Sequence, residues 1–447
     1  MDDSFQDLLQ YAAKLGVQLN GIMPRRLPGR GYGMVATRDV QPAETVLSIP
    51  TRALRTLATV PKAMSRKLDH DVSVHGILAA DLVLSLNDGS SDYAPWDAVL
   101  PTPTDLEGMP MLWPTKLQDL LPSAARTTLV RQQAKLQRDW AATKVWADGE
   151  DGDESKDGTK GKEGKEDKEG KEGKPARLTY EKYLHGWLLV NSRTFYYTTP
   201  RSEKTTKSHD DRMAMQPVAD LFNHAADHGC EAAYAAKGFS FVADRLYKEG
   251  DEVPISYGAH SNDALLVEYG FILTGSTNKW DEVALDAVIL PRLTAAQKDD
   301  LDEVGFLGKY MVDAQTPGGC YRTQIALRRI LCGASAARVA AWRAFVDGLP
   351  DASGGRLEAT QEQLDELLLE LLDEMVDVAQ DTLATIEKLS LKKSAVGTEG
   401  MRDVLARRWH QIESMVVQSA KQLRDDAADS EGEEEVKPKG KPKAKSK

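Results

Sequence analysis

Two stretches of this sequence end in polar side chains that can hold a ligand or move a proton. The first covers residues 216–224 and ends in adjacent Asn223 and His224, whose side chains can both donate and accept hydrogen bonds. The second covers residues 252–258 and ends an extended segment with the phenol of Tyr257. We therefore predict one site built from two separate pieces of chain.

A metal site is the first alternative, because His224, His228 and Cys230 lie close together in the sequence. A zinc site usually has four ligands at regular spacing, and no fourth ligand accompanies these three. Cys230 also lacks a neighbour that would activate its thiol as a nucleophile. His70 and His75 have no partner at metal spacing and are expected to be surface or helix residues. We expect no metal ion in this protein.

A glycine-rich stretch lies near the N-terminus. Gly29, Gly31 and Gly33 permit a tight turn with a closely approachable backbone, and residues 34–36 read as a strand. A dinucleotide-binding fingerprint needs a strand before the glycines and a helix after them, whereas here a loop precedes them and a strand follows. The stretch therefore predicts a turn leading into a strand, and a dinucleotide site is disfavoured.

The composition is that of a soluble globular protein. The chain has 447 residues, which predicts two or three domains, with 41% apolar and 28% charged side chains. A formal net charge of −12 disfavours direct nucleic-acid binding and fits a basic protein partner better. Three cysteines without a CxxC pair disfavour a disulfide framework.

The sequence also indicates where the protein resides. No apolar run approaches the roughly 20 residues that span a bilayer. The first residues are acidic and carry no apolar signal segment. We expect no membrane contact, and a location in the cytoplasm, the nucleus or both.

The first domain is expected to cover residues 1–275. It opens with a helix and a small β unit, and a large insert of mostly helical periodicity follows at about 51–215. Within the insert, residues 148–174 are Gly, Glu, Asp and Lys without an apolar face, which predicts a disordered loop.

The remainder is expected to be helical. Residues 361–388 carry a leucine-rich apolar stripe at helical spacing, which predicts a separate helical domain over 281–425. Residues 426–447 are charged and are expected to be disordered. Their basic half, 437–447, is either a nuclear address or a solubilising tail.

Taken in order, several motifs resemble the SET-domain methyltransferases, specifically the branch that includes the Rubisco large-subunit methyltransferase and its relatives acting on non-histone proteins. The motifs are residues 29–36, 191–195, 219–224, 255–258, 261–262 and 269–271. The resemblance implies an α+β protein: a SET-domain β-fold with a pseudoknot and a large helical insert, followed by an all-helical C-terminal substrate-binding domain.

The resemblance also implies a pocket for S-adenosylmethionine, formed where the glycine-rich turn and the Asn-His motif thread together. Arg30 and Tyr32 would offer backbone groups to this cofactor. Asn223 would hold its amino-acid portion, and His224 would contact the adenine through its main chain. Phe271 would pack on the adenine side.

The same resemblance implies how the reaction is arranged. Arg193 would meet the carboxylate of the cofactor. Tyr257 would contact the cofactor and orient the acceptor amine, and Tyr269 would complete an aromatic channel for a lysine. A lysine has a pKa near 10.4 and must lose a proton before it attacks. No Asp or Glu base is obvious beside Tyr257, so we expect proton loss through desolvation or through water.

Two departures from the family pattern bear on these roles. Arg30 stands where relatives often carry an acidic residue, so only a backbone contact is implied there. No Cys-rich segment follows the motifs, and helices after Phe271 would close the site instead.

The leading hypothesis is a monomeric, S-adenosylmethionine-dependent protein-lysine N-methyltransferase acting on a non-histone protein such as a ribosomal protein. The nearest alternative is a protein-histidine N-methyltransferase. A catalytically silent SET-fold binding module, whose helical domain docks a partner, is a third possibility.

Overall fold

The computed structural model describes residues 3–435 apart from 69–70, 89–90, 154–177, 200–203, 205–210, 236, 275–277, 350–355, 357–358 and 392–394. The contacts between residues divide the chain into two compact units. Unit 1 comprises residues 1–112, 128–259 and 267–270, and unit 2 comprises residues 113–127, 260–266 and 271–447. Unit 2 thus includes residues 113–127 and 260–266 and resumes at 271, whereas the first domain was expected to run unbroken to 275.

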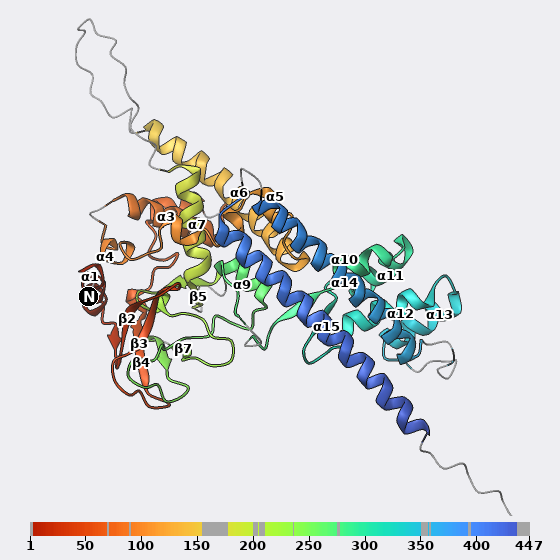
Figure 1. Ribbon diagram of the computed structural model, residues 1–447. Coiled ribbons are helices and arrows are strands. Elements are labelled where there is room, and N and C mark those ends of the chain that lie inside the picture. The colour runs from red at the N-terminus through yellow and green to blue at the C-terminus, as the bar shows by residue number, and fades with distance from the viewer. Residues whose placement is uncertain are drawn as a thin grey trace, which may run out of the picture. The chain divides into compact units, whose positions relative to one another are not determined.

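Among its described residues, unit 1 has three small antiparallel β-sheets (Figure 1). The largest has the order β1-β4-β8-β7, with β1 at Gln18–Leu19, β4 at Thr45–Pro50, β8 at Gly238–Val242 and β7 at Glu231–Ala235. The second is the hairpin of β2 (Ile22–Leu27) and β3 (Gly31–Ala36), and the third pairs β5 (Thr194–Tyr196) with β6 (Met213–Met215). The predicted turn and strand at the glycine-rich stretch are therefore the turn and second strand of a hairpin.

One irregular segment, residues 251–257, threads between two others. The N–H of Ala36 donates to the carbonyl of Asp251, and the N–H of Val253 donates to the carbonyl of Met34, so the segment lies along β3. On its other side Ile255 forms parallel bridges with His224 and with Cys230. Isolated bridges hold the segment. It crosses between β3 and residues 224–230, and this crossing places Asn223 and His224, the Asn-His motif, beside Tyr257.

The helices of unit 1 surround these sheets. They are α1 (Asp3–Lys14), α2 (Lys62–Leu68), α3 (Val74–Asn87), α4 (Ala94–Asp97), most of α6 (Ser123–Asp153), α7 (Tyr180–Arg193) and the end of α9 (Asn262–Tyr269). Short 3₁₀ turns occur at η1 (Thr51–Ala53), η2 (Pro103–Leu106), η3 (Pro110–Leu112) and η5 (Ala219–Leu221). Helix α6 extends to Asp153, so the first residues of the predicted disordered loop are helical, and residues 154–174 lie outside the described part.

Helices α3 and α7 pack closely in the core of unit 1. A Cβ at Gly186 would lie 2.8 Å from the carbonyl oxygen of Ala79, so only glycine permits this approach. The ring of His75 stacks on Trp187 with centroids 4.1 Å apart, and His75 Nε2 lies 2.9 Å from the Trp187 carbonyl oxygen. His75 is thus a buried helix residue, which agrees with the expectation of a surface or helix position; His70 lies outside the described residues.

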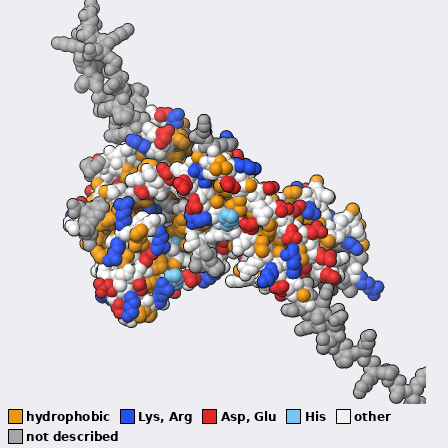
Figure 2. Space-filling view, viewed as in Figure 1, with side chains coloured by type: hydrophobic (Ala, Val, Ile, Leu, Met, Phe, Trp, Pro, Cys, Tyr) orange, Lys and Arg blue, Asp and Glu red, His pale blue; other side chains and the backbone are white. Residues whose placement is uncertain are grey.

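Unit 2 is mainly helical. Its helices are α5 (Thr115–Gln118), α10 (Asp286–Ile289), α11 (Ala295–Glu303), α12 (Tyr321–Cys332), α13 (Ala336–Val346), α14 (Gln361–Ser390) and α15 (Glu399–Glu435), with a 3₁₀ turn η7 at Leu290–Arg292. Helix α14 begins at a capping box between Thr360 and Gln363 and buries its leucine stripe, as its periodicity predicts. Figure 2 shows Lys and Arg interspersed with Asp and Glu over the visible face of unit 2.

Two expectations for the C-terminal part need correction. The region is not entirely helical, because β9 (Glu282–Ala284) pairs with β10 (Met311–Asp313). The predicted disordered tail begins too early, because α15 continues to Glu435. Residues 436–447 lie outside the described part. None of the described helices combines the length and the apolar character needed to cross a membrane.

Candidate active site

The Asn-His motif follows a strained turn at the end of β6. Val218 is fully buried and has φ 72° and ψ −42°, a conformation that β-branched residues rarely adopt and that costs on the order of 1–3 kcal/mol. Such a conformation persists only where its surroundings fix it. The turn leads through η5 to the main-chain carbonyls of Asp220 and Phe222, both of which accept hydrogen bonds from predicted site residues.

Tyr257 is held at both ends. Its hydroxyl donates to the carbonyl of Phe222 at 2.6 Å, and its backbone N–H donates to Nδ1 of His224 at 3.0 Å. Nδ1 can accept only if it carries no proton, so a neutral His224 has its proton on Nε2. The sequence analysis assigned His224 mainly a main-chain role, but its imidazole also fixes the backbone of Tyr257.

Burial keeps the phenol of Tyr257 neutral. Desolvation raises the pKa of Tyr257 to about 12, and of the two nearby charges Arg193 lowers it while Asp220 raises it. At neutral pH the phenol is therefore a hydrogen-bond donor as well as an acceptor.

Tyr269 lies against Tyr257. Their ring centroids are 4.8 Å apart at an interplanar angle of 40°, and burial raises the pKa of Tyr269 as well. The neighbouring Glu268 accepts from Asn191 at 2.9 Å and from Gln132 at 2.6 Å, which ties the end of α9 to α7 and α6. The two tyrosines that the resemblance placed in one channel are in contact.

Arg193, the last residue of α7, reaches the Asn-His motif. One of its terminal nitrogens donates to the carbonyl oxygen of Asp220 at 2.5 Å. Its Nε is buried and has no hydrogen-bond partner among the described residues. A buried donor without a partner is costly, and a ligand carboxylate would satisfy it.

Asn223 is part of a polar chain that includes a residue the sequence analysis did not assign. Its Nδ2 donates to Glu252 at 2.8 Å, and the other oxygen of Glu252 pairs with Arg30. Arg30 therefore has a side-chain role that the resemblance did not imply. A Cβ at Gly33 would lie 2.8 Å from Asn223 Nδ2, so the glycine leaves room for the asparagine.

The two other predicted cofactor residues are placed differently. Tyr32 lies in β3 opposite Arg26, and its ring packs edge-on against Phe5 with centroids 4.5 Å apart. Phe271 is half-buried and belongs to unit 2. Its role at the adenine stays a prediction.

Sequence reasoning did not identify the functions of Asp220 and Glu252. Asp220 is an acid within an otherwise apolar run, and that interruption was a usable signal. Glu252 stands in one of the two opening stretches, but its partners Arg30 and Asn223 come from distant parts of the chain. Only the fold reveals those contacts.

The structure shows the surroundings of two of the candidate metal and nucleophile residues, Cys230 and His228. Burial raises the pKa of the Cys230 thiol to about 12, which leaves it protonated at neutral pH. His228 contacts its neighbour Asp227 at 2.5 Å. Within the described residues, no cluster of three or more His, Cys, Asp or Glu side chains has the arrangement of a metal site.

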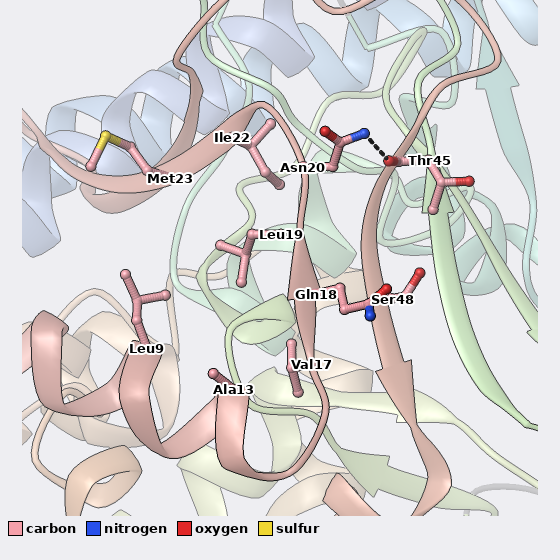
Figure 3. A pocket seen from close by; sticks show the side chains of 10 residues that line it. All are labelled: Leu9, Ala13, Val17, Gln18, Leu19, Asn20, Ile22, Met23, Thr45 and Ser48. Carbon is pink, nitrogen blue, oxygen red and sulfur yellow. Dashed lines mark hydrogen bonds between the residues drawn. The ribbon is translucent and has the colours of Figure 1, made fainter.

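A separate depression of about 850 Å³ lies between α1 and the strands β1, β2 and β4. Figure 3 shows apolar side chains of α1, including Leu9, on one side and Asn20, which donates to the carbonyl of Thr45, on the other. None of the predicted site residues lines it. Size alone does not make it the reaction site, since the polar groups discussed above converge elsewhere in unit 1.

The chain is similar to several known proteins. The SET domain model matches residues 31–258. The chain is 24% identical over 416 residues to mouse SET domain-containing protein 4, covering 90% of this chain and 87% of the relative. It is 27% identical over 196 residues to the ribosomal lysine N-methyltransferase set11 of Schizosaccharomyces pombe, covering 42% of this chain and about half (48%) of that protein.

Two further similarities bear on the fold and on the acceptor. A solved structure of Rubisco LSMT bound to sinefungin and monomethyllysine superposes with a TM-score of 0.62 at 15% identity, covering 96% of this chain and 93% of that one. The actin-histidine N-methyltransferase of dog is 23% identical over 68% of this chain and 49% of its own length. The structural match confirms the expected fold class.

Proposed function

Because the chain belongs to the SET-domain family, we propose that it is an S-adenosylmethionine-dependent protein-lysine N-methyltransferase acting on a non-histone protein such as a ribosomal protein. Methyltransferases predominate among the named relatives, and one of them methylates ribosomal lysine. The observation that carries the proposal is the placement of Tyr257 where the two separate motifs meet. Its phenol is neutral, and hydrogen bonds from its hydroxyl and from its backbone N–H fix its position.

The residues at the crossing fit this cofactor. At Gly29 and Gly31 a Cβ would meet no atom within 4 Å, so the backbone of the hairpin turn is open to a ligand. Arg193 offers a buried donor suited to a carboxylate. We propose that Asn223 and His224 hold the cofactor together with the backbone of Arg30 and Tyr32.

S-adenosylmethionine, when bound, supplies a methyl group already activated on a sulfonium. The protein then needs to align a neutral amine. The phenol oxygen of Tyr257 can accept an N–H of that amine while its own O–H donates to the Phe222 carbonyl, and Tyr269 provides an aromatic wall. A buried, aromatic channel disfavours the ammonium form, so desolvation favours proton loss to water as the amine enters.

Labelled methyl transfer into the proteins of a cell extract, followed by mass spectrometry of the acceptor, tests the proposal. We expect methylated lysine, and at least about tenfold less label with the Tyr257→Phe variant as the matched control. Methylated histidine without methylated lysine would establish the alternative instead, which the similarity to an actin-histidine methyltransferase keeps open.

Cofactor binding separates an enzyme from a silent binding module. Isothermal calorimetry with S-adenosylmethionine should show binding to the wild type and weaker binding to Asn223→Ala, because the alanine removes the amide. A chelator should change neither. Absence of any binding to the wild type would favour the silent module.

A further inference from the structure

A buried polar network in unit 1 supports the Asn-His motif from the side of the helical insert. Trp96, on the short helix α4, donates its indole N–H to Oδ2 of Asp220 at 3.0 Å. Both side chains are almost fully buried, at 1% and 8% exposure. The other oxygen of Asp220, Oδ1, has no partner within the described residues. The carboxylate therefore depends strongly on this indole.

The helix that carries Trp96 is itself fixed. Asp97 receives a hydrogen bond from the buried Arg55 at 3.3 Å, and Arg55 also contacts Asp81 on α3 at 2.8 Å. The Arg55 guanidinium lies 4.3 Å from the ring centroid of Tyr93.

The backbone of Arg55 is bonded to the strand that precedes the motif. Its N–H donates to the carbonyl of Met215 at 3.1 Å, and its carbonyl accepts from the N–H of Met215 at 3.0 Å. The segment from Met215 to Asp220 is thus held at its start by Arg55 and at its end by Trp96. Between these two points lies the strained Val218.

We infer that Trp96 is a positioning residue of the active site, which acts through Asp220 to hold the main-chain carbonyls that Arg193 and Tyr257 contact. The inference rests on the proposed function. Arg193 donates to the Asp220 carbonyl and Tyr257 to the Phe222 carbonyl two residues later. A shift of the Asp220 side chain therefore moves both acceptors.

Electrostatics supports the same assignment. Burial raises the pKa of Asp220, and Arg193 and the Trp96 N–H oppose that rise. Loss of the indole donor leaves a buried carboxylate with less support, which favours its protonation. Arg193 then loses part of its counter-charge, and the field at Tyr257 changes.

The test uses the full-length protein carrying 3-fluorotyrosine at position 257, with ¹⁹F NMR as one readout and calorimetric affinity for S-adenosylmethionine as the other. Trp96→Phe keeps an aromatic ring and removes the N–H. We expect a shifted or broadened fluorine signal and about tenfold weaker binding. An unchanged signal and an affinity within twofold of wild type would overturn the inference.

Trp342→Phe is the matched control. Trp342 is a buried tryptophan of unit 2 whose indole donates to the carbonyl of Ile325 at 3.1 Å. The variant loses a bond of the same type and should be less stable, but its fluorine signal and affinity should match the wild type. Equal changes in both variants would reduce Trp96 to an ordinary core residue and overturn the inference.

Substitutions at Asp220 decide the question if Trp96→Phe does not fold. Asp220→Asn retains an oxygen that accepts from Trp96 but removes the counter-charge of Arg193, so it should weaken binding and shift the fluorine signal by less than Asp220→Leu does. Asp220→Leu cannot accept and should reproduce the tenfold loss and the fluorine shift. Equal effects of Asn and Leu would overturn the inference.

Failure of the proposed function is distinguishable from failure of this inference. A wild type that binds no S-adenosylmethionine refutes the cofactor assignment. The fluorine readout needs no cofactor and still reports whether Trp96 positions Tyr257.

Discussion

At the scale of single residues, the site depends on one phenol held in one orientation. Tyr257 donates from its hydroxyl to Phe222 and from its backbone to His224, and its ring contacts Tyr269. Its pKa of about 12 keeps the proton in place throughout the physiological range. The imidazole of His224 therefore orients Tyr257, and its main-chain contact to the adenine stays a prediction.

Tyr257→Phe should lower kcat by at least about tenfold, because the amine loses its oriented acceptor while the ring remains. Affinity for S-adenosylmethionine should change less than threefold. Single-turnover methyl transfer and calorimetry measure the two quantities. Wild-type turnover in this variant contradicts the role assigned to the phenol.

Residue types alone predicted that two separate stretches come together, as His224 and Tyr257 do. Asn223, His224 and Tyr257 stand out because polar side chains end apolar or extended runs. Trp96 and Asp220 do not stand out in the sequence. They are 124 positions apart, and each could equally be an ordinary core or loop residue. Pairing between distant segments is a property of the fold, which local patterns do not contain.

At the scale of elements, the pair α3 and α7 is the support from which Arg193 projects. Close approach at Gly186 and the stacked rings of His75 and Trp187 hold the two helices together. Burial lowers the pKa of His75 to about 3, with the charge of Lys135 as a smaller cause in the same direction. The native state therefore holds a neutral imidazole.

This pKa gives stability a defined pH dependence. Between pH 6.5 and about 3 the unfolded chain binds a proton at His75 and the folded chain does not, so the free energy of unfolding falls as pH falls through this window. The loss should reach roughly 3–5 kcal/mol near pH 3. Urea unfolding of wild type and His75→Phe at pH 7 and pH 4 measures it.

In His75→Phe the pH dependence should be weaker, since the titrating group is absent. His410 supplies the control because its side chain is 65% exposed, so His410→Gln should leave the wild-type profile intact. If His75→Phe and the wild type lost equal stability between pH 7 and pH 4, His75 would not be the cause of the pH dependence.

The β2–β3 hairpin is the second supporting element. Leu27 and Asn223 leave no room for a side chain at Gly33, where a Cβ would lie 2.6 Å and 2.8 Å from their atoms. The flexible end of Leu27 can move, but Asn223 is also bonded to Glu252. A methyl group here should therefore displace the asparagine.

Gly33→Ala should weaken binding of S-adenosylmethionine at least tenfold and change the melting temperature by only a few degrees. Gly400→Ala is the matched control, because a Cβ in this first turn of α15 would meet only the hydroxyl oxygen of Thr398, at 4.0 Å. Calorimetry compares the three proteins. Equal affinities of Gly33→Ala and wild type would remove Asn223 from the cofactor site.

At the scale of the whole molecule, unit 2 has its own buried polar centre. Arg408 is fully buried and contacts Asp263 at 2.7 Å and Asp281 at 2.8 Å, and it donates to the carbonyl of Glu282. Asn262 adds bonds to Asp281 and Gln411. These contacts join α15 to the start of α9 within unit 2.

Arg408→Met should destabilise the protein by about 3–5 kcal/mol, because two buried carboxylates lose their counter-charge. Arg407→Ala removes the adjacent exposed pair with Asp403 and should cost less than about 0.5 kcal/mol. Chemical unfolding of both variants gives the comparison. Similar losses would mean that the buried triad contributes no more than a surface pair.

Helix α14 was predictable because its apolar residues recur at helical spacing over many turns. The SET fold was predictable because its motifs follow one another in the order typical of the family. The prediction was wrong at the β9–β10 pair and at the end of α15. Strands of three residues are too short to show alternation, and the helical content of the charged segment after residue 426 was underestimated from its lack of apolar side chains.

The threaded segment 251–257 has a consequence for how the protein is made. It pairs with β3 on one side and with residues 224–230 on the other, so one of its partners lies more than two hundred positions earlier in the chain. Closing so long a loop is entropically costly, and contacts of high sequence separation form slowly. Ribosomes release both partners before they release this segment. The nascent chain therefore has no cofactor site until synthesis has passed Tyr257, and the crossing is among the last features of unit 1 to form.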